Sequence, residues 1–306
     1  MKAYVTGASG FIGSHIVRTL REAGWDVGET FVDVGDSTAL EREMKGCDAV
    51  FHLAALYSFR GDPAKFSRVN VDGTRNVLEA ARHTGVPRVV HTSTCATCGP
   101  VAGRAATEDD APPEWELAVP YKATKLAAEK LALAAAHEGL DVVIVNPTTP
   151  VGEGDLVPTP TGKMVRGVAT GRYRGYLGGT GVNLVDVRDV ARGHLLALER
   201  GRAGERYLLG GEDMPLREVF ALIAHAAGRR APRLRVPYAV ARAAAAAGLL
   251  NRQEVALARL PMYFSSEKAR RELGYEPGPP QAAVERAVAE LLDADRPRKT
   301  RRRQPS

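Results

Sequence analysis

The sequence predicts an α/β protein, built as a doubly wound parallel sheet with a smaller, discontinuous C-terminal lobe. Short apolar runs alternate with segments of helical periodicity through the first half of the chain, which is typical of a parallel sheet covered by helices on both faces. A glycine-rich turn joins the first apolar run to the first helical segment. After Pro147 the composition shifts to proline, glycine and threonine, which marks the second lobe. The 306 residues, 44% of them hydrophobic, suffice for both parts.

The individual elements follow from periodicity in chain order. Strands are expected at residues 2–6, 30–32, 49–53, 88–92 and 142–145, and helices at 13–23, 37–44, 63–83, 120–137, 187–198 and 216–227. The first lobe is expected to span residues 1–150, with elements near 183–210 returning to it, and the second lobe to comprise residues 151–182 and 211–290.

The C-terminal tail, residues 296–306, carries six basic and no acidic side chains, so it accounts for the whole formal net charge of +6. The rest of the chain is balanced. We expect a solvated, disordered tail; a nucleic-acid or anionic-membrane arm is the less favoured interpretation.

The turn between the first strand and the first helix has the features of a dinucleotide site. Gly7 permits a tight turn, Gly10 lets a pyrophosphate approach the backbone, and Gly13 lets the helix pack on the strand. The helix that starts around Phe11 and Ile12 presents free N–H groups and a positive dipole end to the phosphates. Strand, glycine turn and helix together predict a Rossmann domain that binds a dinucleotide.

Further segments resemble the extended branch of the short-chain dehydrogenase/reductase superfamily. The glycines are spaced G-x-x-G-x-x-G, and residues 48–55 resemble the fourth strand and H-x-A-A turn of that branch. Residues 70–76 resemble its N-V-x-G-T-x-N helix, and residues 88–94 its fifth strand. These matches run in order along nearly the whole chain. The resemblance implies an enzyme that uses NAD or NADP.

The expected chemistry lies in Thr94, Tyr121 and Lys125. Hydride transfer at a carbinol carbon needs a group that takes or gives the hydroxyl proton. Tyr121 suits this role if its pKa, about 10 when unperturbed, falls, and Lys125, one helical turn further on the same face, is expected to lower it. By resemblance, Thr94 aligns with the residue whose hydroxyl binds the reacting oxygen.

The resemblance also implies the remaining cofactor-binding positions. They are Asp33 and Val34 at the adenine, Leu53, Ala54 and Ala55 on the ribose and nicotinamide side, Asn70 supporting that region, and Pro147 and Thr148 at the carboxamide, beside Gly7, Gly10, Phe11, Ile12, Gly13, Tyr121 and Lys125.

One departure concerns the second strand. In the extended branch this strand ends in a residue that reads the ribose 2′ position, and a loop then leads to the third strand. Here residues 24–27 run almost directly into residues 28–33, so the strand end and its loop are missing. Asp26 and Glu29 are candidates for the ribose contact by proximity alone. The sequence therefore leaves the choice between NAD and NADP open.

The second half narrows the resemblance to the hopanoid-associated sugar epimerase group, through residues 145–155, 158–163, 181–191, 207–212 and 262–269. This implies a sugar or sugar-nucleotide epimerase. The chain has Thr149 and Val182 where such enzymes place an asparagine and a phosphate-binding arginine. A diphosphate needs cationic or N–H partners. Those available in the second lobe are Lys163, Arg166, Arg172 and Arg174.

Two alternatives stay open. Dihydroflavonol-reductase-like proteins share the Thr94, Tyr121 and Lys125 pattern and also lack the phosphate anchors, so an NADPH-dependent carbonyl reductase is the runner-up. An epimerase shows no net nicotinamide turnover, whereas a reductase consumes reduced cofactor. A non-catalytic NADP sensor is less favoured, because the chain keeps both Tyr121 and Lys125.

The three cysteines do not suggest a disulfide framework or a metal site. Cys95-x-x-Cys98 has no second ligand pair at zinc-site spacing, and Cys47 stands alone, so packing is the favoured interpretation and no metal is expected.

No apolar run reaches the roughly 18–20 residues of a membrane span, and the first residues enter a strand directly instead of forming a signal peptide. A cytoplasmic protein with a small-molecule substrate and no nucleic-acid partner is expected. The resemblance also implies a homodimer that pairs the helices after the fourth and fifth strands. The helix at 120–137 has a small-residue face that suits this packing and would equally serve the core, formed by Ala127, Ala128, Leu131, Ala134 and Ala135.

Overall fold

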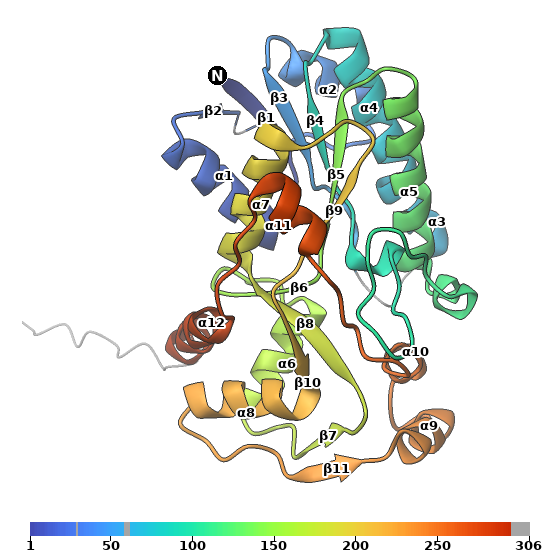
Figure 1. Ribbon diagram of the computed structural model, residues 1–306, viewed down its shortest axis with the longest axis vertical. Coiled ribbons are helices and arrows are strands. Elements are labelled where there is room, and N and C mark those ends of the chain that lie inside the picture. The colour runs from blue at the N-terminus through green and yellow to red at the C-terminus, as the bar shows by residue number, and fades with distance from the viewer. Residues whose placement is uncertain (29, 58–61, 295–306) are drawn as a thin grey trace, which may run out of the picture.

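The computed structural model describes residues 1–28, 30–57 and 62–294. Its larger part is a six-stranded parallel sheet with the order β2-β1-β3-β4-β5-β9 (Figure 1). The strands are β1 (Lys2–Thr6), β2 (Asp26–Val27), β3 (Ala49–His52), β4 (Val89–Thr92), β5 (Val142–Pro147) and β9 (Arg206–Leu209). The predicted strands at 2–6, 49–53, 88–92 and 142–145 are confirmed to within a few residues.

Helices cover both faces of the sheet, as a doubly wound fold requires (Figure 1). On one face lie α1 (Phe11–Glu22), α7 (Val187–Arg200) and α11 (Glu267–Leu273). On the other lie α2 (Ser37–Met44), α4 (Gly73–Thr84) and α5 (Pro120–His137). Alternate residues of each strand supply the two cores: in β5, Val143 and Val145 face α7, while Val142 and Ile144 face the opposite layer.

The predicted helix at 63–83 forms as one helical run with an irregular centre. It begins with α3 (Pro63–Phe66), capped by the Asp62 carboxylate, continues as a π-helical turn over Ser67–Asp72, and ends in α4 at Gly85, whose φ is +68°. Wide turns of this kind often mark functional positions in helices, and this one contains the predicted site residue Asn70.

The smaller part of the fold lies below the carboxyl end of the main sheet (Figure 1). A three-stranded sheet, β10-β8-β6, is made of β6 (Thr149–Val151), β8 (Gly181–Asp186) and β10 (Glu212–Pro215), and β7 (Gly175–Leu177) pairs with β11 (Leu234–Val236). Helices α6 (Pro160–Ala169), α8 (Leu216–Ala226) and α12 (Gln281–Ala294) pack on the three-stranded sheet in one apolar cluster. Helices α9 (Tyr238–Ala246) and α10 (Arg252–Leu257) form a separate small cluster.

The packing of individual elements bears on the proposed division into lobes, which stays a prediction. Helix α7 and strand β9 pack with the main sheet, but β8 pairs within the three-stranded sheet. Helix α11 packs against α7 and β9 although it comes late in the chain. The predicted tail, residues 296–306, lies outside the described residues.

The strand predicted at residues 30–32 is absent, and the prediction was wrong. Strand β2 is only two residues long and pairs with β1 at Lys2 and Ala3 alone. The chain must then travel from Val27 to Val34, which is buried in the second core layer, in too few residues for another strand and its return loop. Residues 30–32 pass beside β1 without strand pairing, and the Tyr4 hydroxyl donates to the Thr30 carbonyl over 3.4 Å.

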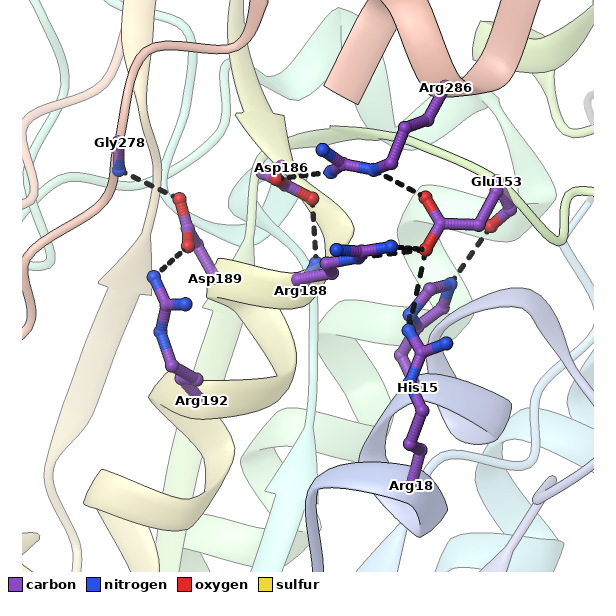
Figure 2. Close-up of polar contacts among 9 residues, drawn as sticks. All are labelled: His15, Arg18, Glu153, Asp186, Arg188, Asp189, Arg192, Gly278 and Arg286. Carbon is purple, nitrogen blue, oxygen red and sulfur yellow. Dashed lines mark hydrogen bonds and ion pairs between the residues drawn. The ribbon is translucent and has the colours of Figure 1, made fainter. Parts of the chain in front are cut away.

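An ionic cluster centred on Glu153 ties the two sheets together (Figure 2). Its carboxylate accepts from Arg188 Nη2 at 2.7 Å and from Arg286 Nε at 2.8 Å, which come from α7 and α12. The His15 ring of α1 donates through Nε2 to the Glu153 carbonyl at 2.9 Å, while its Nδ1 accepts from Arg18. Burial alone would raise the pKa of Glu153. The hydrogen bonds and positive charges of Arg188 and Arg286 outweigh this effect and lower the pKa to about 2.

Candidate active site

A cavity of about 450 Å³ opens at the carboxyl ends of β1, β3, β4 and β5. From β1 the chain first adds β2 on one side of the sheet and then crosses to add β3 and the later strands on the other side. Open α/β sheets bind ligands at the point where the order switches, here between β1 and β3. The cavity is lined by Gly7, Gly10, Phe11, Ile12, Gly13, Leu53, Ala55, Tyr57, Thr92, Ser93, Thr94, Tyr121, Pro147, Thr148, Pro150, Val157, Pro158, Thr159, Thr161 and Lys163.

The glycine turn at the cavity floor tolerates no side chain at two positions. Gly7 has φ +70°, and a Cβ there would lie 2.9 Å from the Ala54 nitrogen. A Cβ on Gly13 would lie 2.1 Å from the Gly7 carbonyl oxygen. Helix α1 follows with Gly10 as its N-cap, which offers no side-chain acceptor, and its first turn carries no acidic residue. The first-turn N–H groups of this helix suit an anion such as a pyrophosphate.

A second observation also fits a dinucleotide at this place. Ser93 is 6% exposed and lines the cavity, and its hydroxyl has no hydrogen-bond partner among the described residues. A buried polar atom of this kind needs a partner, and a bound polar ligand would supply one. The residues present therefore fit the cofactor that the glycine turn implies.

Tyr121 and Thr94 meet at the cavity wall. Tyr121 lies in the first turn of α5, is 8% exposed, and hydrogen-bonds to the Thr94 side chain. Thr94 follows β4 in extended backbone, with φ −158°. Burial raises the pKa of Tyr121 above its ordinary value, although the Thr94 bond opposes this. The expectation that Lys125 lowers the pKa of Tyr121 is therefore not met in this structure, because burial of the phenol dominates.

Lys125 lies one helical turn after Tyr121 in α5 and is not part of the cavity wall. Its ammonium donates to the Thr92 carbonyl over 2.7 Å, so it is directed at the end of β4. Burial lowers the pKa of Lys125 to about 8, and the nearby Glu129 carboxylate partly offsets this. The buried rings of His52 and His91 lie within the influence of this ammonium, and the pKa of each is lowered by burial first and by Lys125 second.

A buried carboxylate network holds the turn that carries Thr94, and the sequence reasoning missed it. Glu129 is 1% exposed and accepts from Thr97 Oγ1 and from Asn146 Nδ2, each at 2.7 Å. Asn146 Nδ2 also lies 3.1 Å from the Thr94 carbonyl. The Thr97 hydroxyl lies 2.8 Å from the same carbonyl, but its single proton goes either to that carbonyl or to Glu129. Arg206 of β9 donates to the other Glu129 oxygen at 3.0 Å.

A sequence signal for Glu129 existed. It follows Lys125 by four residues, as Lys125 follows Tyr121, so all three lie on one face of α5. A charged residue on the inner face of a helix points to a buried partner.

A second missed network surrounds His52 at the end of β3. The Thr6 hydroxyl accepts from the Leu53 and Ala54 N–H groups, both at 3.1 Å, so its proton is directed at His52 Nδ1. The Thr74 hydroxyl donates to the Asn70 carbonyl, and therefore accepts from His52 Nε2 at 2.9 Å. His52 is thus neutral, in agreement with a pKa lowered by burial to about 3. It fixes the backbone of the predicted Leu53 and Ala54 positions.

The other predicted cofactor positions divide into two sets. Those on the cavity wall are Gly7, Gly10, Phe11, Ile12, Gly13, Leu53, Ala55, Tyr121, Pro147 and Thr148. Those off the wall are Asp33, Val34, Ala54, Asn70 and Lys125. Their individual roles stay predictions.

Two residues of the second set have structural contacts of their own. The Asp33 carboxylate accepts from Gly35 N at 2.9 Å in a local turn. Asn70 accepts from Leu56 N at 2.7 Å and donates to Thr124 Oγ1 at 3.1 Å, so it ties the segment after β3 to helix α5.

The cysteines next to the site behave as packing residues. Cys95 and Cys98 are buried in a cluster with Ala106, Leu208 and Phe264. Burial raises the pKa of each thiol to about 12, which makes the reactive thiolate scarce at neutral pH.

This fold and this cavity define an NAD(P)-dependent enzyme of the extended short-chain dehydrogenase/reductase type. The chain belongs to the NAD-dependent epimerase/dehydratase family, whose profile matches residues 3–210. The predicted fold class, superfamily and cofactor class are thereby confirmed.

Individual relatives cover almost the whole chain. A putative dihydroflavonol 4-reductase from Synechocystis sp. is 37% identical, over 94% of this chain and 93% of that protein. Sterol demethylase protein B from Methylococcus capsulatus is 32% identical, over 94% and 98%. The crystal structure of PA4631, a nucleoside-diphosphate-sugar epimerase from Pseudomonas aeruginosa, superposes with a TM-score of 0.82 at 27% identity, over 96% of this chain and 98% of that one. No helix within the described residues is long and apolar enough to cross a membrane.

Proposed function

We propose that the chain is a carbonyl reductase that interconverts a bulky, mainly apolar ketone and its alcohol with NAD(H) or NADP(H). The lining of the cavity carries this proposal. Of the described wall residues outside the expected cofactor positions, only Lys163 is charged. The others are apolar or hydroxyl-bearing: Tyr57, Thr92, Ser93, Thr94, Pro150, Val157, Pro158, Thr159 and Thr161. Such a wall suits an uncharged substrate held by a few polar groups. The reductase that is 37% identical over nearly the full length supports the same class.

The residues at and near the cavity wall would have the following roles in ketone reduction. When bound, the nicotinamide supplies or accepts the hydride. The hydroxyls of Thr94 and Tyr121 bind the carbonyl oxygen, and Tyr121 gives its proton to that oxygen as negative charge develops. A raised pKa keeps Tyr121 protonated at neutral pH, so the acid needed for reduction is in place. Lys125 holds the end of β4 through the Thr92 carbonyl, two residues before Thr94.

A sugar or sugar-nucleotide epimerase, the first expectation from the sequence, is the second candidate. Lys163 on the cavity wall favours it, because an ammonium can bind a phosphate. Arg166 lines a neighbouring cavity, whereas Arg172 and Arg174 are exposed and lie off the cavity wall. A diphosphate would therefore have a single described cation at the catalytic cavity.

The decisive experiment follows cofactor oxidation. Purified protein is mixed with NADH or NADPH and a panel of aryl, alicyclic and long-chain ketones, in parallel with sugar nucleotides. Ketone-dependent oxidation of one equivalent of cofactor per alcohol formed is the expected result. Interconversion of a sugar nucleotide without net cofactor oxidation, together with no ketone reduction, would overturn the reductase in favour of the epimerase.

A homodimer built on α4 and α5 is also proposed. Ala128 and Ala135 of the predicted face are buried within the chain, while Ala134 is exposed and available for a neighbouring copy. The cytoplasmic location stays a prediction.

A further inference from the structure

A gap lies beside the carboxyl half of β1, where the missing strand would have run. The ladder between β1 and β2 stops at Ala3, so no strand of the described chain pairs with the outer edge of Tyr4–Thr6. Residues 30–32 pass at a distance, and a cavity of about 190 Å³ separates them from β1. The cavity is lined by Tyr4, Val5, Thr6, Gly7, Ala8, Ser9, Thr30, Phe31 and Val32.

Phe31 has an unusual position on this cavity. Its side chain contributes to the cavity wall, yet the residue is 79% exposed. An aromatic ring exposed beside a cavity offers its π face to a planar ligand that enters the cavity. No contact within the described chain covers most of this ring.

The cavity adjoins the glycine turn on its β2 side. In dinucleotide-binding sheets the pyrophosphate rests on this turn, and the adenosine half extends toward the end of the second strand. Gly7, Ala8 and Ser9 belong both to the turn and to the cavity lining. The gap beside β1 therefore lies where the adenosine half is expected.

Among the described residues, this wall lacks the charged side chain that usually contacts the ribose. None of the described residues that line the cavity carries a charge. Asp26, a candidate from the sequence, lies opposite Lys2 in the register of β2 and β1. Lys2 is at the other end of β1 from the cavity, about 13 Å from Thr6 by strand rise. Glu29, the other candidate, lies outside the described residues.

We infer that Phe31 and the cavity beside Gly7–Ser9 bind the adenosine half of the cofactor, with the Phe31 ring stacking on the adenine in place of a charged ribose contact. This rests on the proposed use of a nicotinamide cofactor. A ring stacked on the adenine does not contact the ribose 2′ position, where NADH and NADPH differ. The site therefore binds the two cofactors with similar affinity.

The test compares three reduced cofactors by their nicotinamide fluorescence: NADH, NADPH and reduced nicotinamide mononucleotide, which lacks the adenosine half. Phe31→Ala is expected to raise the Kd for NADH and NADPH about tenfold, equivalent to about 1.4 kcal/mol, and to leave the Kd for the mononucleotide unchanged. Leu249→Ala is the matched control, because Leu249 is 78% exposed and lines none of the cavities described above. It should change none of the three constants.

The outcomes separate this inference from the proposed function. If Phe31→Ala leaves the Kd for NADH within a factor of about two, or weakens the mononucleotide equally, Phe31 does not bind adenosine. If the Kd values of the wild-type protein for NADH and NADPH differ by more than about tenfold, a charged group contacts the ribose 2′ position, and the inferred lack of discrimination is wrong. A wild-type chain that binds none of the three cofactors would overturn the proposed function itself.

Discussion

Glu129 and Asn146 share a hydrogen bond of 2.7 Å beneath the turn that presents Thr94 to the cavity. The Asn146 amide also reaches the Thr94 carbonyl, and the Thr97 hydroxyl donates either to that carbonyl or to Glu129. Its charge is balanced by Arg206 and acts on Lys125. One buried carboxylate thus influences the position of one proposed catalytic group and the protonation of another.

Glu129→Gln is expected to lower kcat/KM for ketone reduction about 10- to 100-fold, because a single amide oxygen cannot accept both from Arg206 and from the Thr97 and Asn146 donors beneath the Thr94 turn. The charge also matters: Glu129 raises the pKa of Lys125, so its removal should lower that pKa below about 8. The loss of rate at alkaline pH should therefore begin at a lower pH than in the wild type. Profiles of kcat/KM against pH test this.

The control is Glu138→Gln at the end of the same helix, where the carboxylate is 63% exposed and pairs with Arg82. It should leave the profile unchanged. An unshifted profile in Glu129→Gln would show that Glu129 acts only through the fold.

Tyr121→Phe is expected to reduce turnover about 10²- to 10⁴-fold, since the proton donor is lost while the ring still fills its place. Binding of reduced cofactor, followed by fluorescence, should stay close to wild type. Tyr173→Phe serves as the control, because Tyr173 packs on Phe220 in the smaller lobe. If Tyr121→Phe kept full turnover with an accepted ketone, another group would have to supply the proton.

Glu153 should make the protein sensitive to acid. Its folded pKa of about 2 lies below the ordinary value of 4.5, so its contribution is present above pH 4.5 and is lost as the pH falls toward 2. Glu153→Gln should therefore lower the free energy of unfolding at neutral pH by about 1–3 kcal/mol. The difference from wild type should shrink on acidification, as measured by urea unfolding.

The matched control for this carboxylate is Glu41→Gln, whose exposed partner is His83. A change within about 0.5 kcal/mol is expected there. A Glu153→Gln difference that stays constant with pH would contradict the linkage.

Ala134→Arg tests the proposed dimer. A bulky, charged side chain at this exposed position of α5 should prevent close helix packing between copies and give a monomer in light scattering. Ala243→Arg, at an exposed position of α9, should leave the mass unchanged. A wild-type protein that is already monomeric at micromolar concentration would remove the dimer proposal.

The sequence predicted those parts of the fold and site that depend on local pattern. The helix at 120–137 and the glycine turn could be predicted because periodicity and backbone freedom are local properties. The orientation of Lys125 could not, since it depends on the Thr92 carbonyl of a distant strand. Nor could the loss of the strand at 30–32, because an apolar run does not show whether the neighbouring strand is long enough to pair with it.

The ion pair between Glu129 and Arg206 joins residues 77 positions apart in the sequence. Arg206 belongs to β9, the last strand of the main sheet to be synthesised. During synthesis, Tyr121, Lys125 and Glu129 leave the ribosome well before Arg206 does. Until β9 docks, Glu129 is a carboxylate without its cation, and the Thr94 turn has an incomplete support. The nascent chain therefore acquires its geometry for chemistry only after roughly two-thirds of its length has been made.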